Sequence, residues 1–310
     1  MTRGAPATLA FALLLFAARS LAVSGEEGLR VCLDAKVPPW SFHDRSHSGG
    51  FDAAVADAIA RRLGRRLTLQ WFETKADESS STTLGVNALL SDHLCQLVGG
   101  YPLFESALGE PGTKTARLPD YEGAKPSDRR RSVELGVLVP SRGYQFAAMT
   151  IVLGPAAASA RIADLPDLKG LRLGVETGTF ANAVLMLFGD GRYADQITHV
   201  VPGRDELLPR LEKGDYDATL ISVRRFDAYR AEHPQTKLIP TGYYLPLGFN
   251  MGFVGLSTER DLLDSVDRSI AEMLDSGEIK ALARAAGVTY RPPRQPNVSP
   301  DLKLTDLRRN

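Results

Sequence analysis

Two kinds of hydrophobic pattern alternate along the first part of the chain. Residues 28–33 and 67–72 are short apolar stretches of the kind that forms buried or half-buried strands. Between them, apolar side chains recur every four residues over 51–63, which is typical of a helix that begins after Gly50 and ends at Gly64. The order strand, helix, strand implies a parallel pairing of the two strands with a right-handed crossover.

The same alternation returns in the second half of the chain. An apolar stretch at 171–175 predicts a strand, and residues 180–188 after it have a helical composition. Near the end, an amphipathic helix pair is expected over 261–286 with a break at Gly277. Further strands are expected at 95–98, 134–139, 146–153, 199–201, 216–221 and 252–255, and a further helix at 205–213. Two alternations separated by a small-residue joint at 156–160 predict two α/β lobes.

The turn that joins the strand at 171–175 to its helix has groups that could bind a ligand. Thr177, Gly178 and Thr179 let the backbone turn tightly and aim the first amides of the helix, with two hydroxyls, at one point. Helix N-termini attract anions, so the turn could hold a carboxylate or phosphate. The alternative is a helix N-cap by Thr177 or Thr179 without a ligand.

The N-terminus and the charge balance bear on location and partners. Residues 1–22 have the features of a secretory signal peptide: Arg3, a mostly apolar run, then small residues. We therefore expect export to the periplasm.

Without Arg3 and Arg19 of the leader, the 37 basic residues become 35, against 37 acidic residues. A balance so close to neutral argues against nucleic acid or an anionic membrane as the main partner.

The chain has two cysteines, Cys32 and Cys95. In an oxidising compartment two cysteines are more often bridged than free. The loop that the bridge would close is about 60 residues long, which corresponds to roughly 4 kcal/mol in the chain-entropy model. The alternative is a catalytic cysteine with a histidine partner.

Other catalytic or metal-binding signals are weak. His43 and His47 are four residues apart, but they lie in a Ser/Gly-rich stretch that favours solvated loop histidines over metal ligands. The sequence contains no nucleophile elbow, no His-Glu-x-x-His and no P-loop. We expect no cofactor and no metal.

Several motifs, taken in order, carry a family resemblance. They are Gly50-Phe-Asp52 after a double proline with aromatics, Leu168-Lys-Gly170 after Asp164, Thr177-Gly-Thr179 after Gly174, Gly214-Asp-Tyr-Asp-Ala218, and the closing helix pair. In their order and spacing, the chain resembles family 3 extracellular solute-binding proteins, the periplasmic receptors of amino-acid ABC transporters. The resemblance covers most of 29–288, with 105–133 as an insertion that is rich in Gly, Pro and charge.

The resemblance implies a fold and a division of the chain. The fold is α/β: the two-lobed, type II periplasmic binding protein fold, in which two strands cross between the lobes near 149–153 and 247–251 and act as a hinge. Lobe 1 would consist of 29–150 and 250–290, lobe 2 of 151–249, and a C-terminal tail of 291–310. The ligand would lie between the lobes.

The resemblance also implies a binding site. An aromatic that stacks on the ligand matches Trp40 or Phe42, and the cleft edge matches Gly100 and Tyr101. Tyr144 matches the aromatic before the first crossing, and Thr177, Gly178 and Thr179 match the turn that binds a ligand carboxylate. Arg142 and Arg117 are the nearest candidates for the family's carboxylate clamp, but neither has its spacing. Ser222 stands where amino-acid receptors carry the acid that holds the ligand's ammonium.

These departures argue against a standard amino acid as the ligand, because both of its charges need partners in a buried cleft. The positions of Cys32 and Cys95 resemble a branch of binding-protein-like partners of periplasmic PQQ-dependent (quinoprotein) alcohol dehydrogenases. We therefore expect a monomeric solute-binding protein, not an enzyme, that serves an ABC permease. The alternative is an accessory of a quinoprotein dehydrogenase, and a third, weaker possibility is a cleft dehydratase.

Overall fold

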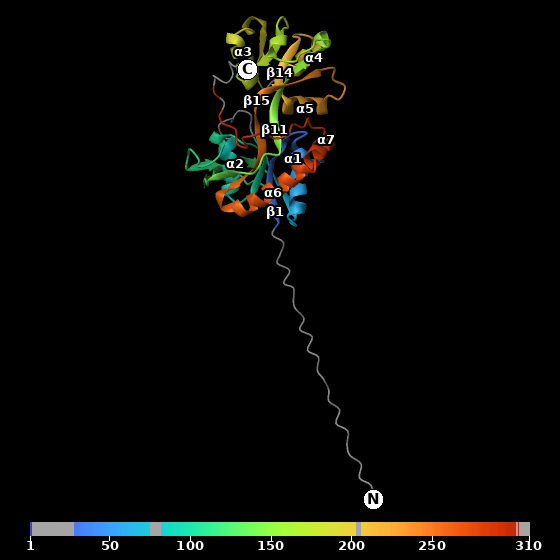
Figure 1. Cartoon of the computed structure of the whole chain (residues 1–310). Helices are drawn as coiled ribbons and strands as arrows, with labels where there is room; N and C mark the ends of the chain where they lie inside the picture. The colour runs from blue at the N-terminus through green and yellow to red at the C-terminus, as the bar shows by residue number, and fades with distance from the viewer. Residues whose placement is uncertain (2–27, 75–81, 203–205, 302, 304–310) are drawn as a thin grey trace.

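Two long strands join two lobes that are stacked one on the other (Figure 1). The computed structural model describes Met1 and residues 28–74, 82–202, 206–301 and 303. The joining strands are β11 (Gln145–Leu153) and β15 (Ile239–Leu256), which pair antiparallel. Apart from Met1, the expected signal peptide (1–22) lies outside the described residues. The predicted α/β fold with two crossing strands is confirmed.

We call the part built on the first strands lobe 1. Its β1 (Leu29–Asp34) runs parallel to β5 (Leu67–Glu73) on one side and to β6 (Leu97–Pro102) on the other. This parallel arrangement was predicted from the strand–helix–strand order. Four helices belong to this lobe: α1 (Phe51–Arg62), α2 (Thr82–Ser91), α6 (Arg260–Asp275) and α7 (Glu278–Ala285).

Lobe 1 has a core on each side of its sheet. One core contains Trp40, Phe51 and the apolar faces of α1, α6 and α7. The other surrounds Cys32 and Cys95 and is closed by α2. Cys32 lies in β1, Cys95 lies just before β6, and the two form a disulfide with 5.6 Å between their Cα atoms. The predicted disulfide is present.

Lobe 2 is built on the second alternation. Its strands are β12 (Leu173–Glu176), β13 (Ile197–Val200) and β14 (Ala218–Ser222), and β12 runs parallel to the other two. Its helices are α3 (Phe180–Leu187), α4 (Leu207–Lys213) and α5 (Val223–Glu232). The strand β14 pairs with β11, so the sheets of both lobes join through the crossing strands into one ten-stranded sheet.

Several short strands lie at the edges. In and next to the segment expected to be an insertion (105–133), β7 (Thr115–Arg117) pairs with β9 (Ser132–Glu134), and β8 (Asp120–Tyr121) extends the main sheet beside β5. The strand β10 (Leu138–Pro140) pairs with β15. A three-stranded sheet of β2 (Lys36–Val37), β3 (Ser41–His43) and β4 (Ser48–Gly49) precedes α1.

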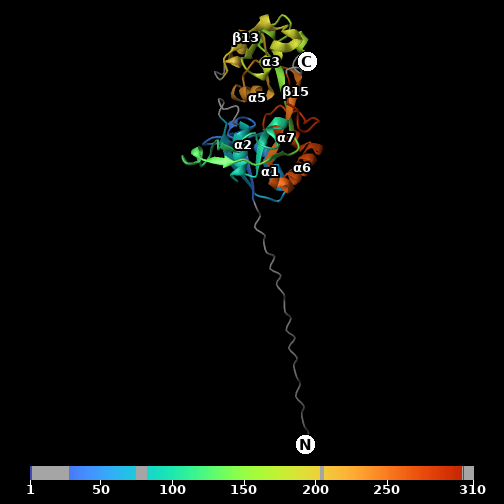
Figure 2. The same ribbon diagram turned by 90° about the vertical axis from the view of Figure 1, so that its left-hand side faces the viewer.

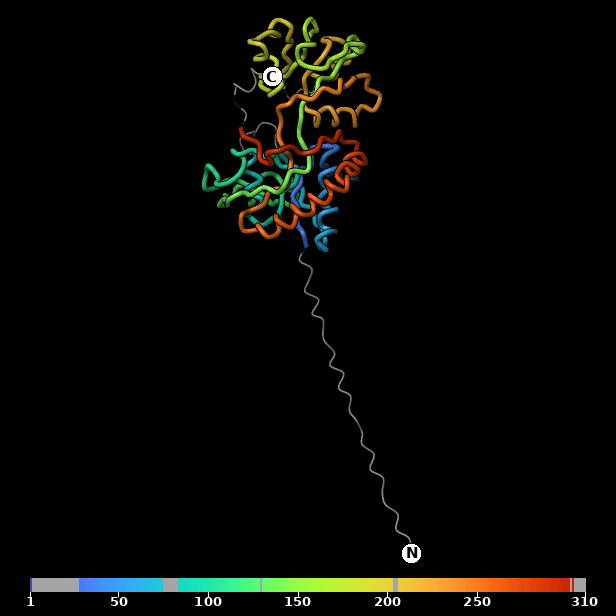
Figure 3. The backbone as a smooth tube through the Cα atoms, in the orientation of Figure 1, coloured from blue at the N-terminus to red at the C-terminus, as the bar shows by residue number. Residues whose placement is uncertain are grey.

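The chain continues beyond α7. The segment that follows, red in Figure 3, runs back across the middle of the molecule between the lobes. We call residues 287–299 the C-terminal strap. Within the part of the chain that the structure describes, no helix has the length and apolar character needed to cross a membrane.

Candidate functional site

The lobe 1 side of the boundary between the lobes is built around the start of α1. Gly50 has a φ of 107°, and a Cβ atom there would lie 2.4 Å from the carbonyl oxygen of Trp40, so this position requires glycine. The backbone N–H of Asp52 donates to that same carbonyl oxygen at 2.8 Å. The loop that carries Trp40 is thereby fixed to the first turn of α1.

A buried polar cluster lies behind this loop. The hydroxyl of Tyr144 donates to Oδ1 of Asp52 at 2.8 Å and accepts from the backbone N–H of Gly100 at 2.9 Å. Burial raises the pKa of the Asp52 carboxyl, while the charge of Arg224 in lobe 2 and the bond from Tyr144 oppose this rise. Burial and the neighbouring Asp52 also raise the pKa of Tyr144 well above its ordinary value. Lobe 1 therefore presents a buried carboxyl group that is under the influence of a cation from the other lobe.

Trp40 is fully buried, with its ring edge-on to Phe51 at 5.6 Å between centroids. The guanidinium carbon of Arg224, from α5 of lobe 2, lies 4.8 Å from the centroid of the Trp40 ring. This distance is within the range of a cation–π interaction. Trp40 is thus both a core residue of lobe 1 and a contact to lobe 2.

The other residues of lobe 1 that the sequence suggested lie apart from this contact. Phe42 is half-buried on β3, next to Gly49. Tyr101 is buried in the core around the disulfide, donates from its hydroxyl to the carbonyl of Ala107, and has a pKa raised by burial to about 12. Arg142 is exposed, and its backbone N–H donates to Asp267 on α6.

On the lobe 2 side, the turn after β12 begins α3. Thr179 is the N-cap: its hydroxyl accepts from the backbone N–H of Asn182 at 3.2 Å and donates to the carbonyl of Glu176 at 2.7 Å. Gly178 has a φ of 78°, as the tight turn requires. Thr177 and Gly178 are exposed. The structure confirms an N-cap at Thr179, and the ligand-binding role of Thr177, Gly178 and Thr179 stays a prediction.

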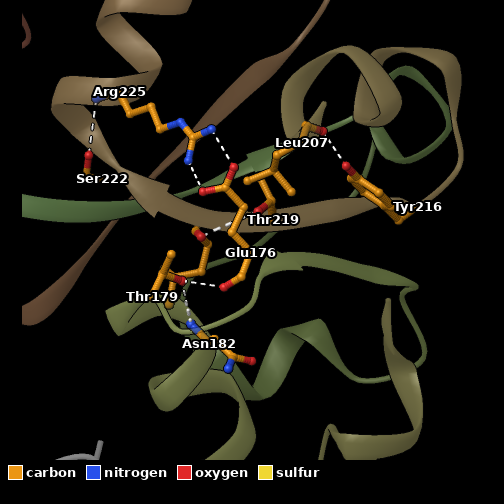
Figure 4. A network of polar contacts seen from close by, with 9 residues as sticks. Glu176, Thr179, Asn182, Leu207, Tyr216, Thr219, Ser222 and Arg225 are labelled. Carbon is orange, nitrogen blue, oxygen red and sulfur yellow. Dashed lines mark hydrogen bonds and ion pairs between the residues drawn. The ribbon is translucent and has the colours of Figure 1, made fainter. Parts of the chain in front are cut away.

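The side chain of Glu176 points the other way, toward α5 (Figure 4). Glu176 is 4% exposed, and both of its carboxylate oxygens accept from the guanidinium of Arg225, one of them from Nη2 at 2.6 Å. The hydroxyl of Ser222, the N-cap of α5, accepts from the backbone N–H of Arg225 at 3.2 Å. The bidentate ion pair and the cap fix the start of α5, and with it the direction in which Arg224 leaves the helix.

A cavity of 640 Å³ opens beside Arg224, between the lobes. Its volume is within the range of small-molecule sites, about 300–1,000 Å³. Lobe 1 contributes the loop at Lys36, and lobe 2 contributes α4 and α5. The lining residues are Lys36, Val37, Pro38, Leu208, Pro209, Ser222, Arg224, Arg225, Ala228, Tyr229, Glu232 and His233. Of the predicted site residues, Ser222 lines this cavity and Trp40 lies under its Arg224. Among the described residues, no group of His, Cys, Asp and Glu could hold a metal ion.

The C-terminal strap also connects the lobes. Asp227 on α5 accepts from the backbone N–H and from the hydroxyl of Thr289, which follows α7 of lobe 1. Further along, the guanidinium of Arg291 lies 4.1 Å from the ring centroid of Tyr244, and that of Arg294 lies 4.2 Å from the ring centroid of Phe146. Both rings belong to the crossing strands, so the strap lies against the hinge.

Solved structures with a similar fold are two-lobed binding proteins. The L-cystine solute receptor of Neisseria gonorrhoeae, in its unliganded open conformation, has a TM-score of 0.59 and 17% identity, over 85% of this chain and 94% of that one. The second substrate-binding domain of a putative amino acid ABC transporter from Streptococcus pneumoniae has a TM-score of 0.58 and 16% identity, over 84% and 100%. The second substrate-binding domain of Lactococcus lactis GlnP, in its open conformation, has a TM-score of 0.57 and 15% identity, over 84% and 95%.

At these identities the likeness establishes the fold, which is that of two-lobed periplasmic binding proteins. No protein-family model matches the sequence, and no curated protein matches it.

The structure adds site residues that the sequence did not single out. Arg224 and Arg225 follow β14 directly, at the carboxyl end of a strand, which is where ligands bind in open α/β sheets. Their position directly after a predicted strand could have indicated a ligand site from the sequence. Adjacent arginines in a helix are more often solvent-exposed, however. Asp52 belongs to the motif Gly50-Phe-Asp52, but its proximity to a cation from lobe 2 depends on tertiary structure.

Proposed function

We propose that this protein is a periplasmic solute-binding protein that captures a small molecule between its lobes. One observation carries the proposal: a 640 Å³ cavity is lined by residues of both lobes in a fold where two crossing strands join them. A ligand that contacts both lobes favours the arrangement in which they are close, and hinge closure of this kind is known from periplasmic binding proteins. The role is binding and not catalysis.

The solute is not a standard α-amino acid. At the end of β14, the position that would hold an ammonium carries Ser222, whose hydroxyl is used to cap α5. The two residues that line the cavity next along α5 are the cations Arg224 and Arg225. The buried carboxyl of Asp52 is bonded to Tyr144, and that of Glu176 is bonded to Arg225. An ammonium group that enters the cavity would therefore lose its water without gaining a buried carboxylate that has no other partner, which is energetically unfavourable.

A binding screen with the exported protein, signal peptide removed, tests this function. A ligand at 100 times its Kd stabilises the folded state by about 2.7 kcal/mol, which raises the melting temperature by several degrees. We expect such a shift with components of a pooled metabolite extract, accompanied by a smaller radius of gyration in X-ray scattering. The twenty standard amino acids should give no shift. Absence of any shift with the whole extract would contradict the proposed function. A shift with a standard amino acid would contradict the proposal that amino acids are not the solute.

Delivery of the solute is proposed to involve the permease of an ABC transporter. Affinity capture on the tagged protein, from a whole lysate of the source cell treated with detergent, should retain a permease in the presence of the stabilising extract. Retention of a soluble quinoprotein dehydrogenase instead would favour the accessory role that the cysteine positions suggest.

A further inference from the structure

Arg224 reaches from one lobe to the other. It is the second residue of α5, which lies at the edge of lobe 2 that faces lobe 1 (Figure 2). Its guanidinium lies over the ring of Trp40, whose loop belongs to lobe 1. The neighbouring Arg225 is bonded in a bidentate manner to Glu176 within lobe 2. The two adjacent arginines therefore have different roles, and Arg224 is the one directed at the boundary.

Two buried donors at this contact have no acceptor among the described residues. Nη1 of Arg224 and Nε1 of Trp40 are both shielded from solvent, and neither donates a hydrogen bond to a residue that the structure describes. Trp40 itself is 0% exposed. A buried donor that has lost water without gaining a partner is costly, and native proteins contain few of them. Both belong to one residue pair whose guanidinium carbon and ring centroid are 4.8 Å apart.

The cavity next to this pair has a cation from each lobe. Lys36 lines it from lobe 1, and Arg224 and Arg225 line it from lobe 2. Lys36 pairs with Glu73 at 3.4 Å, and both side chains are more than half exposed. Glu232, also exposed, is the one acidic side chain among the lining residues that the structure describes. The rest of the lining includes Val37, Pro38, Leu208 and Tyr229, which offer apolar surface.

We infer that the cavity takes an organic carboxylate with an apolar body and no ammonium group, and that Arg224 is the residue that binds its carboxylate. This inference rests on the proposed function and names the ligand class for that site. A carboxylate oxygen is an acceptor for the guanidinium of Arg224, which lines the cavity, and charge-assisted bonds of this type are strong. Arg224 also contacts Trp40 of lobe 1, so a ligand bound to it connects α5 to the opposite lobe.

The test uses matched compounds on the full exported protein. Aliphatic and aromatic acids of two to ten carbons are compared with amides and amines on the same carbon skeleton, for example succinate, succinamide and 1,4-diaminobutane, or benzoate, benzamide and benzylamine. Melting temperature identifies the binders, and calorimetry gives their affinity. We expect one or more acids to bind, and the corresponding amide and amine to bind at least about tenfold more weakly, because the guanidinium of Arg224 is then left without a charged acceptor.

Two variants assign the effect to Arg224. Arg224→Gln should lower the affinity for the acid about tenfold or more, and Arg224→Lys should retain part of it, since it keeps the charge and loses the planar fork. Arg268→Gln removes the same charge from the exposed face of α6 and should leave the affinity unchanged. Melting without ligand and circular dichroism verify that each variant is folded.

The outcomes separate this inference from the proposed function. Binding of amides or amines but of no acid overturns the inference while the solute-binding function stands. Equal affinity of wild type and Arg224→Gln for an acid also overturns it. Absence of any acid that binds overturns the inference, and absence of binding by any component of the metabolite extract overturns the proposed function itself.

Discussion

Asp227 accepts hydrogen bonds from both the backbone N–H and the hydroxyl of Thr289, each 2.7 Å long. The two residues belong to different lobes, and neither lies on a crossing strand. The carboxylate is fully buried and also accepts from Arg230 at 2.8 Å. The C-terminal strap is therefore a third connection between the lobes, and any hinge motion must carry it along or break this contact.

Thr289→Val tests the strength of this connection. The substitution keeps the shape of the side chain and removes one hydrogen bond to a buried carboxylate, so we expect a loss of about 1.5–3 kcal/mol in the free energy of unfolding. Chemical denaturation measures it. Thr198→Val, at an exposed position on β13, is the control and should change stability by less than about 0.5 kcal/mol. A Thr289→Val protein as stable as the control would show that the strap is held by its other contacts.

Much of the fold follows from the sequence because its elements have strong local signals. The helix pair expected over 261–286 is found as α6 and α7, with Gly277 in the left-handed conformation between them. The length of β15 was underestimated, however, because Pro240, Gly242 and Pro246 disfavour a strand. Its pairing with β11 over both lobes supplies the hydrogen bonds that the local composition does not predict.

The site was less accessible to prediction, because it depends on which residues meet across the lobe boundary. The N-cap at Thr179 is a local property and was foreseen. Arg224 and Trp40 are 184 positions apart in the sequence, and their contact depends on the angle between the lobes. From the sequence alone, Glu176 is the polar residue at the end of a strand. The structure shows that its carboxylate pairs with Arg225.

Reduction of the Cys32–Cys95 disulfide should destabilise lobe 1. The two cysteines are 63 residues apart, and releasing a loop of that length costs about 4 kcal/mol in the chain-entropy model. Denaturation with and without a phosphine reductant measures the difference, and Cys32→Ala combined with Cys95→Ala should show no further effect of the reductant. Alkylation of two thiols in the unfolded, non-reduced protein would contradict the disulfide itself.

Asp52→Asn should change how stability depends on pH. Burial raises the pKa of Asp52 above 3.8, so in the window above 3.8 the folded protein holds a proton that the unfolded chain has released. The free energy of unfolding of wild type should therefore fall relative to Asp52→Asn as the pH rises through this window, and the difference should be constant below it. Denaturation at a series of pH values gives the difference curve. Asp275→Asn, on the exposed end of α6, controls for the loss of one charge. A difference that rises with pH would mean that Arg224 outweighs the burial of Asp52.

Tyr144→Phe tests whether the hydroxyl of Tyr144 supports the structure of lobe 1 in addition to any part in binding. Its removal leaves the N–H of Gly100 without an acceptor and the carboxyl of Asp52 without a donor, in a place that is closed to water. We expect a loss of about 1–3 kcal/mol in the free energy of unfolding. The bond from Tyr144 favours the charged form of Asp52, so its loss should raise the pKa of Asp52 further and extend the pH-dependent window of the preceding experiment to higher pH. Tyr290→Phe is the control, because the hydroxyl of Tyr290 makes no hydrogen bond to a described residue, and it should stay within about 0.5 kcal/mol of wild type. If Tyr144→Phe matches this control in both stability and pH dependence, the Asp52–Tyr144–Gly100 cluster does not stabilise lobe 1, and Tyr144 is free to serve the solute as the sequence suggested.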